Sequence, residues 1–262
     1  MKHIALNHYS RGTIRDPWSE HSSPTKLYTA PGLGDRVTCL WGLYQWAKKE
    51  NHSGVTVHLN KNHWISGNPK VNKPDSWKEI SELFNDVKFE LMFHPDMPIQ
   101  NDYNTLKWLR EEKDIEALMY YYDKPDAEIN ITEYLKDKIL LDPPKNTDIK
   151  FPWPKQSFVT MQWDGSGPRR PREEVINRIR LYYKNNGYEI VDIGMRQTLA
   201  DIAYYLHHAD YHIGMESGMF HMAQLYKKHS QIHLYTASGA TDHSRRAKEY
   251  GSPVNYLIGK II

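Results

Sequence analysis

The second half of the chain alternates between strand-like and helix-like segments, and this alternation restricts the possible folds more than any other feature. Buried-strand patterns are expected at 157–162, 188–193, 211–214 and 231–235. Helical spacing of apolar residues is expected at 172–185, 198–208 and 218–228, and a last helical turn at 244–250. Gly187 stands where a helix would end. Strands that alternate with helices form a parallel sheet covered by those helices.

The first hundred residues repeat this succession. Strands are predicted at 26–30, 55–59 and 87–92, and helices at 36–49 and 76–84. Residues 1–24 are polar and are interpreted as an irregular lead-in, whereas 103–122 and 131–141 have helical spacing.

Four prolines divide these two halves. Pro143, Pro144, Pro152 and Pro154 cluster within a short stretch that is typical of a linker. The sequence therefore predicts an α/β protein with an N-terminal Rossmann-like lobe at 1–150 and a C-terminal one at 151–262. The two lobes are expected to face a central cleft.

Composition excludes several classes of protein. The chain has 262 residues, of which 39% are hydrophobic and 25% charged, so it can bury a real core and is not disordered. Its formal net charge of +2 permits an anionic ligand without requiring nucleic acid. One cysteine, Cys39, rules out an internal disulfide. We find no signal peptide and no apolar run of about 18 residues, so we expect a cytoplasmic protein without a transmembrane segment.

The first candidate site motif is Pro31-Gly32-Leu33-Gly34-Asp35, between a predicted strand and a predicted helix. Glycines let the backbone turn tightly there and approach a ligand, and a helix N-terminus offers free N–H groups. Asp35 could take a proton from an attacking hydroxyl. The alternative is that Asp35 only caps the helix and that the two glycines are ordinary turn residues.

The second motif is the stretch Gly214–His221, which runs from a strand into a helix. Ser217 suits the N-cap, and Gly218 lets a diphosphate approach the N–H groups of the first turn. Glu216 could accept hydrogen bonds from ribose or sugar hydroxyls, and His221 could donate to a phosphate. The alternative is a plain Ser-capped helix with a core histidine.

Two further loops contain residues that suit phosphate or sugar binding. Arg169 and Arg170 follow a predicted strand and could hold a diphosphate, unless they belong to a solvated basic loop. Ser238 and Thr241 lie in a loop of small and hydroxyl residues that could equally be plain surface. The histidines match no common zinc spacing, and no DxD pair is present, so we expect neither a metal nor a cofactor.

In this order the motifs resemble the ADP-heptose:lipopolysaccharide heptosyltransferase family of GT-B glycosyltransferases. The resemblance covers about 27–50 and 157–251 and is carried by Gly34-Asp35, Arg169 or Arg170, Glu216-Ser217-Gly218 with His221, and 239–242. It departs from the family pattern at Glu216, where an aspartate is usual, and at the arginines, where a lysine is usual.

The resemblance implies an inverting, metal-independent transfer of a sugar from a nucleotide diphosphate-sugar, the substrate, to a hydroxyl acceptor. Asp35 would be the general base, and Gly34, Arg169, Arg170, Glu216, Ser217, Gly218, His221, Ser238 and Thr241 would bind the donor. The acceptor is expected to be a glycan or a lipid-linked saccharide. The alternatives are a phage-type enzyme acting on a hydroxymethylated pyrimidine in duplex DNA, an epimerase, and a non-catalytic nucleotide-sugar-binding protein.

Overall fold

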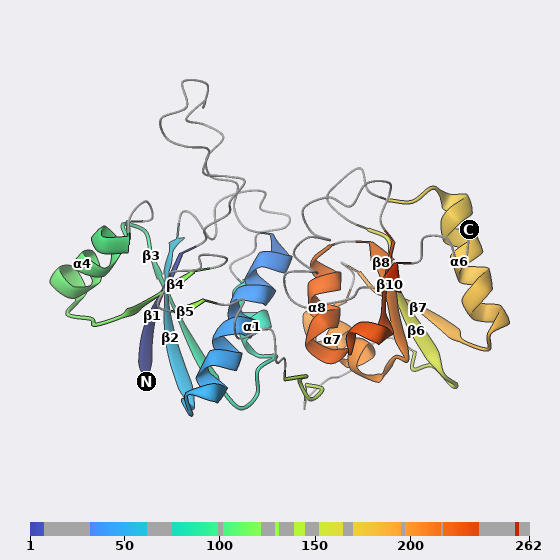
Figure 1. Cartoon of the computed structure of the whole chain (residues 1–262), viewed down its shortest axis with the longest axis horizontal. Helices are drawn as coiled ribbons and strands as arrows, with labels where there is room; N and C mark the ends of the chain where they lie inside the picture. The colour runs from blue at the N-terminus through green and yellow to red at the C-terminus, as the bar shows by residue number, and fades with distance from the viewer. Residues whose placement is uncertain are drawn as a thin grey trace, which may run out of the picture. The chain divides into compact units, whose positions relative to one another are not determined.

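The chain forms two compact units. The computed structural model describes residues 1–7, 32–61, 75–98, 102–121, 129–130, 139–144, 152–164, 170–194, 197–215, 217–235 and 255–256. One unit spans Met1–Lys138 and the other Ile139–Ile262. Each contains a five-stranded sheet whose described strand pairs are all parallel (Figure 1). The predicted α/β class with parallel sheets is therefore confirmed.

The first unit arranges its strands in the order β3-β2-β1-β4-β5. These are β1 (Lys2–Asn7), β2 (Gly54–Asn60), β3 (Lys88–His94), β4 (Leu118–Tyr121) and β5 (Ile129–Asn130). Its described helices are α1 (Leu33–Lys49), α3 (Asp75–Ser81) and α4 (Asp102–Lys113). Helix α4 covers one face of the sheet and α1 the other (Figure 1). Strand β2 is buried along its whole length, as expected for a strand inside a parallel sheet.

The second unit has the strand order β10-β9-β8-β6-β7. The strands are β6 (Phe158–Gln162), β7 (Glu189–Asp192), β8 (Tyr211–Met215), β9 (Ile232–Tyr235) and β10 (Asn255–Tyr256). Helix α6 (Glu173–Asn185) covers one face, and α7 (Leu199–His208) and α8 (Gly218–Tyr226) cover the other (Figure 1). A 3-10 turn at His229–Gln231 leads into β9. The core under α6 is formed by Val159, Met161, Trp163, Ile176, Ile179, Tyr183 and Ile213.

The residues at the helix ends explain why several predicted boundaries are accurate. Helix α7 begins after Thr198, which forms a capping box with Asp201. Helix α6 ends where Gly187 adopts a φ of 84°, a conformation that favours glycine, so its predicted role is confirmed. Helix α1 ends at Lys49, and two residues later Asn51 adopts a φ of 58° while the amide of His52 donates back to the Ala47 carbonyl.

The N-terminal predictions need three corrections. Residues Lys2–Asn7 form the central strand β1, not an irregular lead-in, because Ile4, Ala5 and Leu6 are buried between two neighbouring strands. The predicted strand at 26–30 lies outside the described residues. Helix α1 begins at Leu33, so Gly34 and Asp35 belong to its first turn rather than to a loop before it.

The third correction concerns 103–122, which was predicted to be one helix. Helix α4 stops at Lys113, and 118–121 form β4, which pairs with β1. The connection turns at Asp114, which has a φ of 55°. Of the helix predicted at 131–141, the described residues 139–141 are not helical. The helical turn predicted at 244–250 lies outside the described residues.

Three histidines, which we call the histidine row, lie side by side on the α4 side of the first sheet. His3, His58 and His94 come from β1, β2 and β3. The Nδ1 of His3 lies 3.0 Å from the Nε2 of His58, and the Nδ1 of His58 lies 2.9 Å from the Nε2 of His94. Burial and the two neighbouring imidazoles lower the pKa of His58 to about 4.

None of the described helices is long and apolar enough to cross a membrane.

Candidate functional site

The strand order of the second sheet marks one position on its edge. From β6 the chain goes to β7 on one side of β6, and then crosses over to β8 on the other side. Helices that follow these strands therefore leave toward opposite faces, and the carboxyl ends of β6 and β8 form a topological switch point. Ligands of open α/β sheets bind in the crevice at such a point.

Ser217 caps the helix that starts at this switch point. Its Oγ accepts a hydrogen bond from the amide of Met219 at 3.2 Å, and Ser217 is the N-cap of α8. Its hydroxyl donates to the Oε1 of Gln162, the last residue of β6, at 2.7 Å. The amide of Gly218 donates to no described residue. The predicted Ser-capped helix start is confirmed, and it is tied to the neighbouring strand.

Gly214 lets β8 approach β6 closely just before the switch point. A Cβ at this position would lie 2.8 Å from the backbone carbonyl oxygen of Gln162 and 3.3 Å from the Nε2 of His212. No side chain other than hydrogen fits there without moving the backbone. Glycine is therefore required at Gly214 for a steric reason within the sheet, which the sequence did not indicate.

A line of buried polar side chains leads to the same position. His212 and Thr160 are buried, and the Nδ1 of His212 lies 3.1 Å from the Thr160 hydroxyl. Burial lowers the pKa of His212 to about 3, so its ring is neutral at physiological pH. Its Nε2 has no hydrogen-bond partner among the described residues. Buried polar groups cost stability unless they are hydrogen-bonded, and the contact between Thr160 and His212 offsets part of that cost.

The α6 side of this edge contains an aromatic pair and a charged group. Trp163 follows β6, is 5% exposed, and packs edge-on against Tyr235 at the end of β9, with ring centroids 6.5 Å apart. Arg170 is exposed and forms ion pairs with Asp164 at 3.6 Å and Glu173 at 3.1 Å. Exposed pairs of this kind contribute at most about 1 kcal/mol, so the Arg170 guanidinium can exchange them for an anionic ligand.

The predicted donor-binding residues can now be placed in part. Ser217, Gly218 and Arg170 lie at the carboxyl edge of the second sheet. His221 lies one turn into α8, is half-buried, and packs edge-on against Phe220. The predicted residues Arg169, Glu216, Ser238 and Thr241 lie outside the described residues.

The Gly34-Asp35 pair occupies the corresponding edge of the first unit. The first sheet reverses its strand order between β1 and β4, and α1 is the helix that follows β1. The C-terminus of α1 leads into the start of β2, so the first turn of α1 lies at the carboxyl edge. The Gly34 carbonyl accepts from the Thr38 hydroxyl at 2.8 Å. The side chain of Asp35 lies outside the described part of the chain.

Sequence reasoning missed Gln162. A glutamine at the end of an apolar strand carries no motif, and only its pairing with Ser217 across two strands indicates a role. The sequence did contain one signal, because Gln162 is a polar residue at the carboxyl end of a strand expected to be buried. Ligand-binding side chains collect at the carboxyl ends of such strands.

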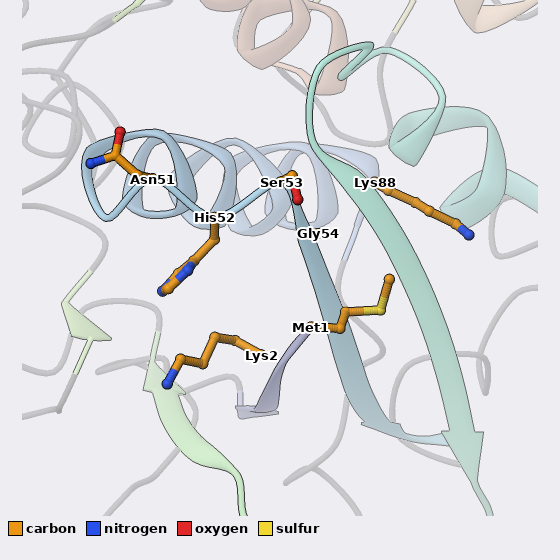
Figure 2. A pocket seen from close by; sticks show the side chains of 7 residues that line it. All are labelled: Met1, Lys2, Asn51, His52, Ser53, Gly54 and Lys88. Carbon is orange, nitrogen blue, oxygen red and sulfur yellow. The ribbon is translucent and has the colours of Figure 1, made fainter.

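A depression elsewhere on the first unit does not have the form of a binding site. It has a volume of about 360 Å³ at the amino ends of β1, β2 and β3 and is lined by Met1, Lys2, Asn51, His52, Ser53, Gly54 and Lys88. Figure 2 shows the side chains of Lys2 and Lys88 extending in different directions. Its two lysines therefore do not converge on one anion.

Histidine, cysteine, aspartate and glutamate side chains form no group of three able to hold a metal ion within the described ranges.

Comparisons with known proteins give structural similarity only. No protein-family model matches the chain, and no curated protein matches its sequence. The fold is similar to the iron-containing dodecameric glycosyltransferase TibC from enterotoxigenic E. coli H10407, with a TM-score of 0.47 and 11% identity. That likeness covers 89% of this chain and 57% of the TibC chain, so this chain spans little more than half of TibC.

Two further solved structures give similar values. The glycosyl transferase family 9 protein from Veillonella parvula DSM 2008 has a TM-score of 0.47 and 12% identity over 89% of this chain and 80% of its own. A complex of the heptosyltransferase TibC with ADP-D-beta-D-heptose has a TM-score of 0.45 and 11% identity over 89% of this chain and 57% of TibC. All three of these solved structures are glycosyltransferases.

Proposed function

We propose that the chain is a glycosyltransferase that binds a nucleotide diphosphate-sugar at the carboxyl ends of β6 and β8. The observation that carries this proposal is the Ser217-capped start of α8 at the switch point of the second sheet. An N-terminal helix turn presents free amides and a positive dipole end, and the Gly218 amide is available to an anion. Arg170 adds a positive charge at the same edge.

In the proposed reaction, an acceptor hydroxyl attacks the anomeric carbon from the side opposite the nucleoside diphosphate, which inverts that carbon. Asp35 takes the hydroxyl proton as general base. The start of α8, His221 and an arginine at 169 or 170 stabilise the charge that develops on the leaving diphosphate. Glu216 contacts sugar or ribose hydroxyls, Ser238 and Thr241 line the donor site, and the acceptor is a glycan or lipid-linked saccharide.

Binding of nucleoside diphosphates is the first test. We expect ADP, UDP, GDP or CDP to raise the midpoint of thermal unfolding, by an amount that grows with ligand concentration because the ligand binds the folded state. The same shift should persist in EDTA if the diphosphate is held by protein groups alone. No shift with any of the four nucleotides at millimolar concentration would contradict the proposal.

The role of Asp35 is tested by Asp35→Asn, which keeps the size of the side chain and removes its basicity. We expect the nucleotide-sugar that binds best to retain its affinity, while the rate of sugar transfer falls by about 100-fold or more. Transfer is measured with labelled donor and with saccharide and hydroxymethylated-DNA acceptors in parallel. Transfer at the wild-type rate would remove Asp35 from the mechanism and leave donor binding intact.

A further inference from the structure

Gln162 is an almost fully buried polar residue whose placement is not explained by packing. It is 2% exposed, at the carboxyl end of strand β6, which lies between β8 and β7. The Oε1 atom accepts from the Ser217 hydroxyl at 2.7 Å. The Nε2 atom donates to no described residue. A leucine would fill a similar volume without the cost of burying a polar amide.

The hydrogen bond from Ser217 to Gln162 fixes the orientation of the Ser217 hydroxyl, which caps α8. Because the Ser217 hydroxyl proton points to Gln162, the lone pairs of the same oxygen are free to accept from the amide of Met219 at 3.2 Å. The cap therefore has one orientation, set from the neighbouring strand. The amide of Gly218, directly after the cap, stays available as a donor.

The same bond also places the unpaired end of Gln162 at the start of α8. Oε1 and Nε2 share one carbon, so Nε2 lies beside the cap that Oε1 contacts. Its N–H groups and the N–H of Gly218 are both donors, and an anion is the ligand that accepts from both. Thr160 and His212, which lie deeper on the same face, are paired with each other at 3.1 Å and do not compete for Gln162.

We infer that Gln162 is a binding residue for the diphosphate of the donor, which it contacts through Nε2 while its Oε1 holds the Ser217 cap. This inference rests on the proposed function and assigns one more residue to the same site. Gln162 would act from the floor of the site, between the carboxyl ends of β6 and β8, whereas Arg170 acts from the rim.

The decisive variant is Gln162→Glu. A glutamate keeps an oxygen that accepts from Ser217, so the cap survives, but it replaces the N–H donor by negative charge beside the anion. We expect the affinity for the nucleoside diphosphate, measured by calorimetry at pH 8, to fall by about 30-fold or more. The loss should shrink at pH 5.5, where the glutamate takes up a proton more readily.

Gln197→Glu is the matched control. Gln197 precedes α7, and its side chain accepts from the Gly194 amide after β7, so the same charge is added to the same edge of the sheet. We expect its affinity to stay within about twofold of the wild type. Gln162→Leu removes both ends of the amide and should weaken binding by about 10-fold. If Gln162→Glu does not fold, the affinity of Gln162→Leu tests the inference instead.

The outcomes separate the two levels of the proposal. Wild-type protein that binds none of the four nucleoside diphosphates overturns the proposed function and this inference with it. Binding by Gln162→Glu and Gln162→Leu within twofold of a wild type that does bind overturns only the role of Gln162.

Discussion

Replacing Gly214 by alanine is expected to lower the free energy of unfolding of the second unit by about 3 kcal/mol, near the upper end for overpacking. The added Cβ would lie 2.8 Å from the backbone carbonyl oxygen of Gln162, which belongs to the neighbouring strand and cannot rotate away. The strands β6 and β8 would have to separate at the switch point. Hydrogen exchange of β8 peptides, followed by mass spectrometry, reports this loss for the second unit by itself.

Gly194→Ala provides the control for this substitution. Among the described residues, a Cβ at Gly194 would meet only the Oδ2 of Asp164, at 3.9 Å, which is an ordinary contact. We expect alanine there to be neutral or to stabilise slightly, because it restricts the unfolded chain. Equal exchange rates in Gly214→Ala and Gly194→Ala would show that β8 does not need its glycine. A loss of nucleotide affinity in Gly214→Ala alone would link the strand spacing to the site.

The second large effect is a loss of stability of the first unit at acid pH, which we expect from protonation of the histidine row. Burial holds the pKa of His58 at about 4, whereas the unfolded chain has a value near 6.5. Between these values the unfolded state binds the additional proton, so stability is fully present above pH 6.5 and is lost as the pH falls toward 4. The difference corresponds to a loss of at most about 3 kcal/mol from His58.

The hydrogen bonds within the row explain why protonation is unfavourable. A neutral His58 carries one N–H, so it donates to one neighbour and accepts from the other, and the row has a single direction. Protonating His58 forces both neighbours to accept at once and places a charge inside the sheet. The pKa of His94 is also lowered, by burial and then by Lys113 from α4.

A His58→Gln variant tests this assignment. Between pH 6.5 and 4 the hydrogen exchange of β2 peptides should change less with pH in this variant than in the wild type. His52→Gln is the control, because His52 packs against Trp46 outside the row. An unchanged pH dependence in His58→Gln would assign the acid sensitivity of the first unit to other groups, such as His94.

The sequence by itself determined most of the second unit. Its apolar segments are separated by clear caps, Thr198 at the start of α7, Ser217 at the start of α8 and Gly187 after α6, and local chemistry of this kind is visible in sequence. The same local signals predict an anion site at Ser217 and Gly218, and the Ser217 cap is confirmed. In the first unit, β1 was missed because a short apolar stretch between polar residues carries little periodicity.

Only the tertiary structure decided which distant residues meet. Ser217 and Gln162 are 55 positions apart, as are His3 and His58, and each pair forms because parallel strands lie side by side in one register. The order of the strands depends on which face of the sheet each connecting helix covers. A local sequence pattern does not show this order. The Gly214–His221 stretch was thus visible as a capped helix, whereas its place at a switch point, joined to Gln162, depends on the packing of β8 against β6.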